Sequence, residues 1–387
     1  MRALLALAML AVPLGAVEIA TGRMLGAGYD ARSFYIRGNE SQAWKKTYTG
    51  AEFRPEAAGR LMNLRVAQAI VHDEWLTEEK FDPEANTNRV IAALDGYKRH
   101  GILEISTSLQ GANPAYELTD HIKRQRAYSL GPGKGMSMSA FRLDGSLKPE
   151  WMGRTLRLVR ALDERGMILH LLYFYQHQDE VLRDPAAIRQ AAINATDWLI
   201  ENNVRNVIIE VANEIDAGTY DHGRYIRKNL GELVKLIRSR FEERKAGYTL
   251  PISTSTTGGG SKMEVPEEIV AHGDFILLHG NNITPEQKRR RTADLAKDPR
   301  TAMPIVFSED NNGRETDAAT LVQELASADA IFEGGGSWGY MPWRPAQIFP
   351  FRVYDPLHAT GQDAEYFRKV LQHIQSLVYA QPPKVAK

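Results

Sequence analysis

The chain has 387 residues, with 48 basic and 48 acidic side chains and no cysteine. This length allows one large α/β domain with a sizeable buried core. The balanced charge gives no reason to expect nucleic acid or an anionic membrane surface as a partner. The absence of cysteine excludes disulfide bonds and thiolate metal sites.

The first residues have the parts of a secretory signal. Arg2 precedes an apolar run over residues 3–12, and the small residues Gly15 and Ala16 follow. We therefore expect residues 1–16 to be a signal peptide that is cut after Ala16, which makes the protein secreted or periplasmic. The run is shorter than the roughly 20 residues that a membrane-spanning helix needs, so we expect no stable membrane insertion after cleavage. A membrane anchor or a core helix is the alternative.

From residue 56 onward, strand-like and helix-like patterns alternate. Short apolar runs predict eight strands, at residues 61–71, 102–109, 167–175, 206–212, 250–255, 275–278, 304–307 and 335–340. Helical patterns lie between several of them, at residues 85–99, 149–165, 185–201, 225–245 and 317–332. This alternation predicts an α/β fold, a (β/α)8 TIM barrel over residues 56–387.

Two segments stand apart from this rhythm. Residues 17–55 are expected to decorate the N-terminus, with residues 33–37 as a strand in a hairpin across the barrel floor. Residues 112–150 look like a long loop, which is either a lid or binding loop or a surface insertion without function.

Two predicted strands end in glutamate. Asn213-Glu214 closes the fourth strand and Glu309 follows the seventh. Carboxyl ends of barrel strands face the mouth where the chemistry of this fold takes place. Cleavage of a glycosidic bond needs one carboxyl group that protonates the leaving oxygen and a second that attacks or shields the anomeric carbon. Alternatively, Glu214 begins a helix and Glu309 belongs to an acidic loop with Asp310.

Asn213-Glu214, Glu309 and Trp338 in the eighth strand resemble clan A glycoside hydrolases, the group that includes cellulase-like family 5 enzymes. The resemblance implies that Glu214 is the acid/base and Glu309 the nucleophile. It also implies that Asn213 contacts the sugar 2-hydroxyl and that Trp338 forms the floor under the reacting sugar.

The sequence departs from the family 5 pattern in two places. Family members usually carry His-any-Tyr on the sixth strand, where this chain has His279-Gly280-Asn281. Arg65 resembles the arginine beside the family nucleophile, but two predicted strands separate it from Asn213-Glu214, one more than the pattern has. Runs such as Phe174-Tyr175-Gln176 are also similar to an uncharacterised group of secreted bacterial barrel proteins near this clan.

Further strand-end side chains are candidates for sugar binding through hydroxyl contacts or stacking, although each is also explained by packing or ordinary hydrogen bonding. They are Gln110, Tyr175, Gln178, His279 and Asn281. His72, Asp73 and His177 lack the tight spacing of a metal site, so we expect no metal and no cofactor. The basic run at residues 288–291 is interpreted as a solvated helix face.

These observations predict a retaining glycoside hydrolase that cleaves a β-linked oligo- or polysaccharide. Two alternatives stay open. One is a barrel that binds carbohydrate without turnover, which the departure on the sixth strand favours. The other is a metal-dependent barrel hydrolase that uses His72, Asp73 and His177.

Overall fold

The computed structural model describes residues 17–38, 41–71, 81–111, 138–176, 178–218, 220, 222–258, 263–310, 316–342, 346–347 and 351–381. The predicted signal peptide, most of the loop at 112–150, and His72, Asp73 and His177 lie outside these residues. Within the described ranges, no helix combines the length and hydropathy needed to cross a membrane.

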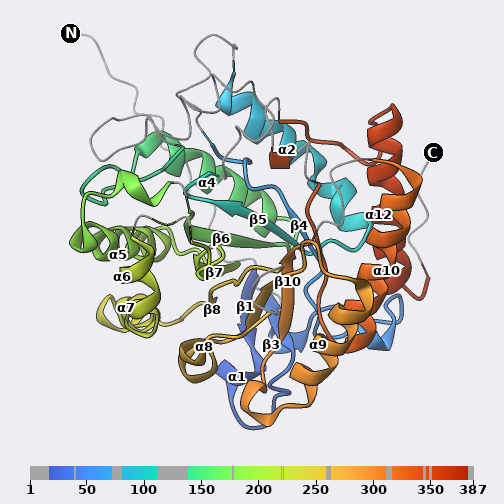
Figure 1. The fold of residues 1–387 in the computed structure, drawn as a ribbon, viewed down its shortest axis with the longest axis horizontal. Coiled ribbons are helices and arrows are strands. Elements are labelled where there is room, and N and C mark those ends of the chain that lie inside the picture. Colours follow the sequence, from blue (N-terminus) through green and yellow to red (C-terminus); the bar gives the residue numbers. More distant parts are fainter. Residues whose placement is uncertain are drawn as a thin grey trace.

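In the described part of the chain, eight strands form the barrel and confirm the predicted (β/α)8 fold. Their sheet lies at the centre of the molecule (Figure 1). They are β4 (Asn63–Arg65), β5 (Glu104–Ser108), β6 (Ile168–Phe174), β7 (Val207–Ala212), β8 (Ile252–Ser253), β9 (Ile276–His279), β10 (Ile305–Glu309) and β11 (Gly339–Tyr340). A parallel sheet runs in the order β11-β4-β5-β6-β7-β8, and β9 pairs with β10.

Backbone contacts join these two sheets into a ring. A parallel bridge between Val306 and Ser337 connects β10 to the segment before β11. On the other side, the amide of Asp274 donates to the carbonyl of Ile252 at 2.9 Å. The close approach near β11 requires glycine, because a Cβ atom on Gly339 would lie 1.9 Å from Oδ1 of Asn63.

Helices surround the barrel (Figure 1). Their bounds are α2 (Pro83–Arg99), α4 (Pro149–Asp163), α5 (Pro185–Glu201), α6 (Gly223–Lys228), α7 (Leu230–Glu243), α8 (Glu267–His272), α9 (Pro285–Lys297), α10 (Ala318–Gly334) and α12 (Gln362–Val378), with 3-10 turns at Pro55–Ala57, Asp179–Val181 and Pro299–Thr301. Several begin with a polar cap followed by proline, as in Asp82-Pro83 and Asp184-Pro185, where the aspartate accepts from backbone amides of the first turn. The helix predicted at 225–245 is divided into α6 and α7 at Asn229.

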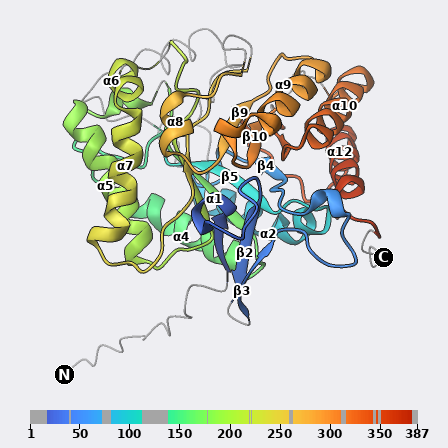
Figure 2. The same ribbon diagram turned by 90° about the horizontal axis from the view of Figure 1, so that it is seen from below.

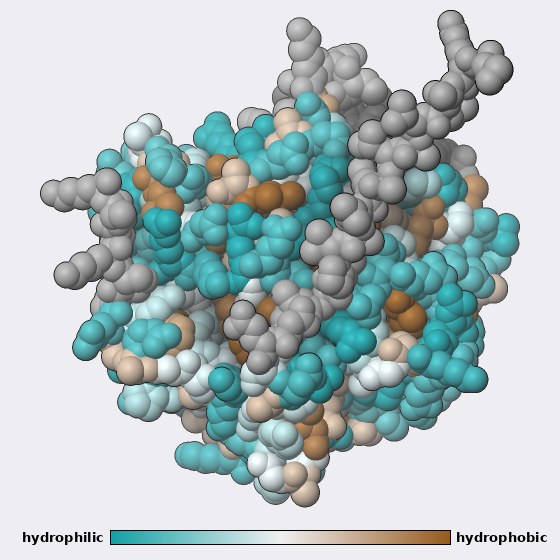
Figure 3. Space-filling model, turned by 180° about the vertical axis from the view of Figure 1, so that it is seen from behind, coloured by the Kyte–Doolittle hydropathy of each residue, from teal (hydrophilic) through white to brown (hydrophobic). Residues whose placement is uncertain are grey.

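The core lies both inside the barrel and between the barrel and its helices. Every residue of β6 and β7 is buried, as expected for parallel strands that are covered on both faces. Among the described residues, the only large hydrophobic side chains that are well exposed are Tyr29, Leu143 and Val322. The face in Figure 3 is accordingly mostly hydrophilic, with small, scattered hydrophobic areas.

A small antiparallel sheet lies at the barrel floor. It consists of β1 (Val17–Thr21), β2 (Phe34–Gly38) and β3 (Ser41–Lys46). The short helix α1 (Gly22–Leu25) lies between β1 and β2 in the sequence. The amide of Ile19 donates to the carbonyl of Arg205, just before β7 begins, so the sheet packs at the amino ends of the barrel strands (Figure 2). The strand expected at 33–37 is β2, whereas the domain boundary at residue 55 stays a prediction.

Two local predictions are wrong. The strand predicted at 61–71 forms only over Asn63–Arg65. Backbone carbonyls after it accept hydrogen bonds from side chains of α2 instead of from a neighbouring strand. The backbone carbonyl of Gln68 accepts from the side-chain amide of Asn86 at 2.7 Å, and the backbone carbonyl of Ala69 accepts from the Thr87 hydroxyl at 2.8 Å. The basic run at 288–291 does lie on helix α9, but Lys288 is fully buried rather than solvated.

Candidate active site

Asn213 and Glu214 follow β7 directly, at the carboxyl end of the strand. Glu214 has a φ angle of 45°, in the left-handed backbone region that residues other than glycine rarely adopt. Its amide donates to the Ser255 hydroxyl at 2.8 Å, and this contact fixes the turn to the end of β8. The Glu214 side chain is partly accessible, with 17% exposure, so it can exchange protons with a ligand or water.

Glu309 ends β10 and is held by a cation and an amide. Its Oε2 lies 3.0 Å from Nε of Arg65, and its Oε1 accepts a 2.7 Å hydrogen bond from the side-chain amide of Asn281. The Arg65 side chain is 2% exposed and that of Glu309 is 7% exposed, so this ion pair is shielded from water. Gly258 lets the Asn281 backbone come close, since a Cβ there would lie 2.8 Å from the Asn281 nitrogen.

His279 joins the two glutamates. Its Nδ1 lies 3.0 Å from Oε1 of Glu214 and 3.6 Å from Oε2 of Glu309. One carboxylate oxygen of each glutamate and one ring nitrogen of His279 all lie within 4.8 Å of one another. Burial alone would lower the pKa of His279, but the carboxylates of Glu309 and Glu214 outweigh it and raise this pKa above its ordinary value.

Arg65 also connects Glu309 to Asn213. Its Nη2 donates to Oδ1 of Asn213 at 2.7 Å. Two strands, β5 and β6, do separate Arg65 from Asn213 in the sheet, as the sequence predicts. The arginine reaches across the inside of the barrel instead, so the departure from the family pattern does not prevent the contact. Burial would lower the pKa of Arg65, but Glu309 and Glu210 raise it.

Gln176, at the exit of β6, contacts the candidate site and is not among the residues predicted from the sequence. Its Nε2 donates to Oε2 of Glu214 at 3.0 Å, and its Oε1 accepts from Nδ2 of Asn213 at 3.0 Å. Its position in the polar sequence Gln176-His177-Gln178 at a strand end is the feature of the sequence that could have indicated it, but only Gln178 of this sequence is among the predicted sugar-binding residues.

Three other candidates lie around the β5 and β6 exits. Gln110 is fully buried, donates to the carbonyl of Gln178 at 2.9 Å and accepts from the amide of Tyr175 at 2.9 Å. The Gln178 side chain accepts from the amide of Met138 at 3.0 Å. These contacts join the two strand exits, and sugar binding by Gln110, Gln178 and Tyr175 stays a prediction.

Trp338 directly precedes β11. Its ring has no exposed surface, and its Nε1 donates to Oδ2 of Asp310 at 2.8 Å. Asp310 also forms a fully buried 2.7 Å ion pair with Lys288 of α9. Because Asp310 follows Glu309 directly, this network anchors the end of β10. The role of Trp338 as a sugar platform stays a prediction.

Glu214, His279 and Glu309 could supply three ligand atoms to a metal ion. The Arg65 guanidinium already neutralises Glu309 at 3.0 Å and would repel a cation there. The donor set therefore fits proton transfer and carboxylate chemistry better than metal binding.

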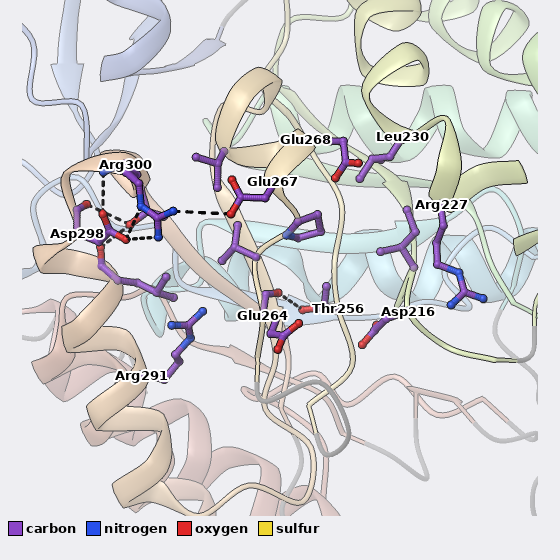
Figure 4. Close-up of a pocket in the computed structure, with 16 residues that line it drawn as sticks. Asp216, Arg227, Leu230, Thr256, Glu264, Glu267, Glu268, Arg291, Asp298 and Arg300 are labelled. Atoms are coloured by element: carbon purple, nitrogen blue, oxygen red, sulfur yellow. Dashed lines mark hydrogen bonds and ion pairs between the residues drawn. The ribbon is translucent and has the colours of Figure 1, made fainter. Parts of the chain in front are cut away.

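A separate cleft of about 540 Å³ lies beside α8 (Figure 4). Neither Glu214 nor Glu309 lines it. Many of its polar groups contact each other, as Arg300 does with Asp298 and Glu267. The cleft therefore lies outside the candidate active site.

No protein-family model matches the chain, and no curated protein sequence is significantly similar to it. Solved structures do share its fold. A broad-specificity endoglucanase of glycoside hydrolase family 5 from Bacteroides salanitronis has a TM-score of 0.54 at 10% identity, covering 88% of this chain and 98% of that one. A family 5 xyloglucanase from Paenibacillus pabuli has a TM-score of 0.51 at 12% identity, with 81% and 98% covered.

An exo-β-1,4-mannosidase from Opitutaceae bacterium strain TAV5 has a TM-score of 0.50 at 17% identity, covering 85% of this chain and 62% of that one. The chain therefore has the fold of clan A, family 5-like glycoside hydrolases, and the predicted resemblance is confirmed at the level of the fold.

Proposed function

We propose that the protein is a retaining glycoside hydrolase acting on a β-linked oligo- or polysaccharide, with Glu214 as acid/base and Glu309 as nucleophile. The observation that supports this most strongly is that one carboxylate oxygen of each glutamate lies within 4.8 Å of the other. Retaining glycosidases hold their carboxyl groups about 5–5.5 Å apart, whereas inverting enzymes hold them about 6.5–9.5 Å apart to admit a water.

The reaction has two steps. An oxygen of Glu309 attacks the anomeric carbon while Glu214 gives its proton to the leaving oxygen, which produces a glycosyl ester on Glu309. Glu214 then takes a proton from water, the hydroxide attacks the anomeric carbon, and Glu309 leaves as a carboxylate. The greater exposure of Glu214 suits the residue that must reach both the leaving group and water.

The surrounding contacts support these roles. Arg65 and Asn281 hold both oxygens of Glu309, which keeps the nucleophile oriented. Asn213 is fixed between Arg65 and Gln176, in a place where it can meet a sugar hydroxyl. The structural neighbours are described as an endoglucanase, a xyloglucanase and a β-mannosidase, which favours a β-linked glycan as substrate. The N-terminal pattern favours secretion or a periplasmic location.

The test is a screen of aryl β-glycosides and β-glycans, followed by proton NMR of a fresh reaction before the product mutarotates. We expect the first product to keep the anomeric configuration of the substrate. An inverted first product would reject the pairing of Glu214 with Glu309. Sugar binding without turnover would identify a non-catalytic barrel, and turnover that a chelator abolishes would identify a metal enzyme.

A further inference from the structure

A fully buried ion pair involves the residue that follows Glu309. Nζ of Lys288, on α9, donates to Oδ1 of Asp310 at 2.7 Å and to the Ser327 hydroxyl of α10 at 2.9 Å. Lys288, Asp310 and Ser327 are all fully buried. Oδ2 of Asp310 accepts from the indole nitrogen of Trp338 at 2.8 Å. Both carboxylate oxygens of Asp310 are therefore held, one from α9 and the other from the segment before β11.

Stability alone does not explain this ion pair. Removal of two charges from water costs free energy that their attraction recovers only with good geometry, so an apolar pair of similar volume is often as stable. The charges add selectivity, because a buried ammonium group must lie where oxygen atoms accept its protons. An apolar pair could slide without that penalty. The contact between Lys288 and Asp310 therefore restricts how α9 and the end of β10 can move relative to each other.

The end of β10 is a place where such a restriction matters. The pairing of β10 with β9 shifts register between Phe307 and Glu309, so the regular ladder is interrupted at the proposed nucleophile. An irregularity of this kind changes the direction of nearby side chains, and the ladder alone then does not fix where Glu309 points. The backbone of the next residue is held from another strand, because the carbonyl of Asp310 accepts from the Met341 amide at 3.1 Å.

Lys288 and Asp310 also contact the turn that carries Asn281. The Gly280 amide donates to the carbonyl of Glu309 at 2.8 Å. A Cβ atom on Gly280 would lie 2.7 Å from Oδ1 of Asp310 and 3.0 Å from Cε of Lys288, so the turn packs directly on the ion pair. The next residue, Asn281, donates its side-chain amide to Oε1 of Glu309 at 2.7 Å. The ion pair thus joins the two segments whose side chains meet in this hydrogen bond.

We propose that Lys288 and Asp310 are positioning residues, whose ion pair holds the turn after β9 against the end of β10 and keeps Asn281 in contact with Glu309. This inference rests on the proposed function, in which Glu309 is the nucleophile. Both residues are fully buried and act through the Asn281–Glu309 contact. A nucleophile that turns away from the anomeric carbon reacts more slowly, so loss of the ion pair should lower kcat more than it raises KM.

A double-mutant cycle tests this route. Lys288→Met keeps most of the apolar stem and removes the ammonium group. We expect it to lower kcat/KM at least about fivefold in the otherwise wild-type protein, mostly through kcat. In a protein that already carries Asn281→Ala, the same substitution should lower kcat/KM less than about twofold, because the contact through which it acts is absent. An unchanged kcat/KM in Lys288→Met, or an equal loss in both backgrounds, would overturn the proposal.

Arg238→Met is the matched control. It removes another ion pair between a helix and a strand, since Arg238 of α7 lies 2.8 Å from Asp274, just before β9 begins. This pair is at the opposite end of β9 from Asn281, so kcat/KM should stay within about twofold in both backgrounds. If Lys288→Met does not fold because Asp310 is left as an uncompensated buried charge, the combination Lys288→Met with Asp310→Asn removes both charges and keeps an acceptor for Trp338. It should show the same dependence on Asn281.

Hydrogen exchange gives a readout that needs no turnover. The Gly280 amide, which donates to the carbonyl of Glu309, should exchange at least about tenfold faster in Lys288→Met than in the wild type. Arg238→Met should leave its exchange unchanged. An unchanged Gly280 exchange in Lys288→Met would overturn the role of the ion pair. A wild-type protein that hydrolyses no glycoside would instead reject the proposed function, and the exchange of Gly280 would still decide whether the ion pair holds the two segments together.

Discussion

The side-chain amide of Asn281 donates a 2.7 Å hydrogen bond to Oε1 of Glu309. Asn281 stands where family 5-like enzymes usually carry a tyrosine, so an amide takes the place of a hydroxyl donor beside the proposed nucleophile Glu309. The departure that favoured a barrel without turnover therefore leaves the carboxylate supported.

We expect Asn281→Ala to lower kcat/KM about 10- to 100-fold, because a hydrogen bond to a charged group contributes about 1.5–3 kcal/mol. Asn282→Gly is the control, since Asn282 is exposed and its φ of 60° suits glycine. Equal kcat/KM in the Asn281→Ala variant and the wild type would remove Asn281 from the site.

The two glutamates should respond differently to the leaving group. We expect Glu214→Gln to lower kcat about 10²- to 10⁴-fold for poor leaving groups. For glycosides of acidic phenols, kcat of this variant should fall much less, because their leaving oxygen needs no proton. Glu309→Gln should be nearly inactive with all of them. Steady-state rates over a series of aryl glycosides measure this, and a Glu309→Gln variant that regains activity with acidic phenols would exchange the two assignments.

Gln176 should matter through two amide contacts. Gln176→Ala removes the donor to Glu214 and the acceptor for Asn213, so we expect kcat/KM to fall about tenfold on the scale of about 0.5–1.5 kcal/mol per hydrogen bond. Gln190→Ala is the matched control, because Gln190 also makes an amide-to-amide bond, at 2.8 Å to Asn194, on an exposed helix face. If both variants behave like the wild type, Gln176 does not position the pair.

Trp338→Phe separates two roles of the tryptophan. Loss of the indole donor leaves Asp310 with one partner fewer, so the free energy of unfolding should fall by about 1.5–3 kcal/mol. Urea unfolding measures this change. KM, measured in parallel, tests the platform role. A loss of substrate affinity that is larger for Trp338→Ala than for Trp338→Phe would support that role, and a KM like that of the wild type in both variants would reject it.

Stability should depend on pH through the buried histidines. The buried carboxylates of Glu104 and Glu210, which lie 2.8 and 3.0 Å from the His170 ring nitrogens, raise the pKa of His170 to about 9 in spite of burial. The pKa of His279 is raised as well. The folded state therefore binds protons that the unfolded state releases. This proton binding stabilises the fold fully below about pH 6.5, and the stabilisation is lost as the pH rises through about 9. We expect Tm to fall between these values. A constant Tm across this window would contradict a charged His170.

The strand ends could be predicted because short buried runs and the polar residues after them are local features. Asn213-Glu214 and Glu309 needed only this pattern and the barrel geometry that brings strand ends together. The contacts of Arg65, Gln176 and His170 depend on which side chains point inward from neighbouring strands, and this follows from the register of the whole ring. Lys288 could not be recognised as buried because its partner Asp310 is on another element.

The strained backbone at Glu214 has a consequence for what can be gained by mutation. A φ of 45° costs a glutamate on the order of 1–3 kcal/mol, which the rest of the barrel must offset. Glycine adopts this angle without that cost, so Glu214→Gly should remove the backbone strain. A Glu214→Gly protein that melts at a higher temperature than the wild type would show that the backbone conformation needed for the proposed acid/base residue lowers the stability of the fold.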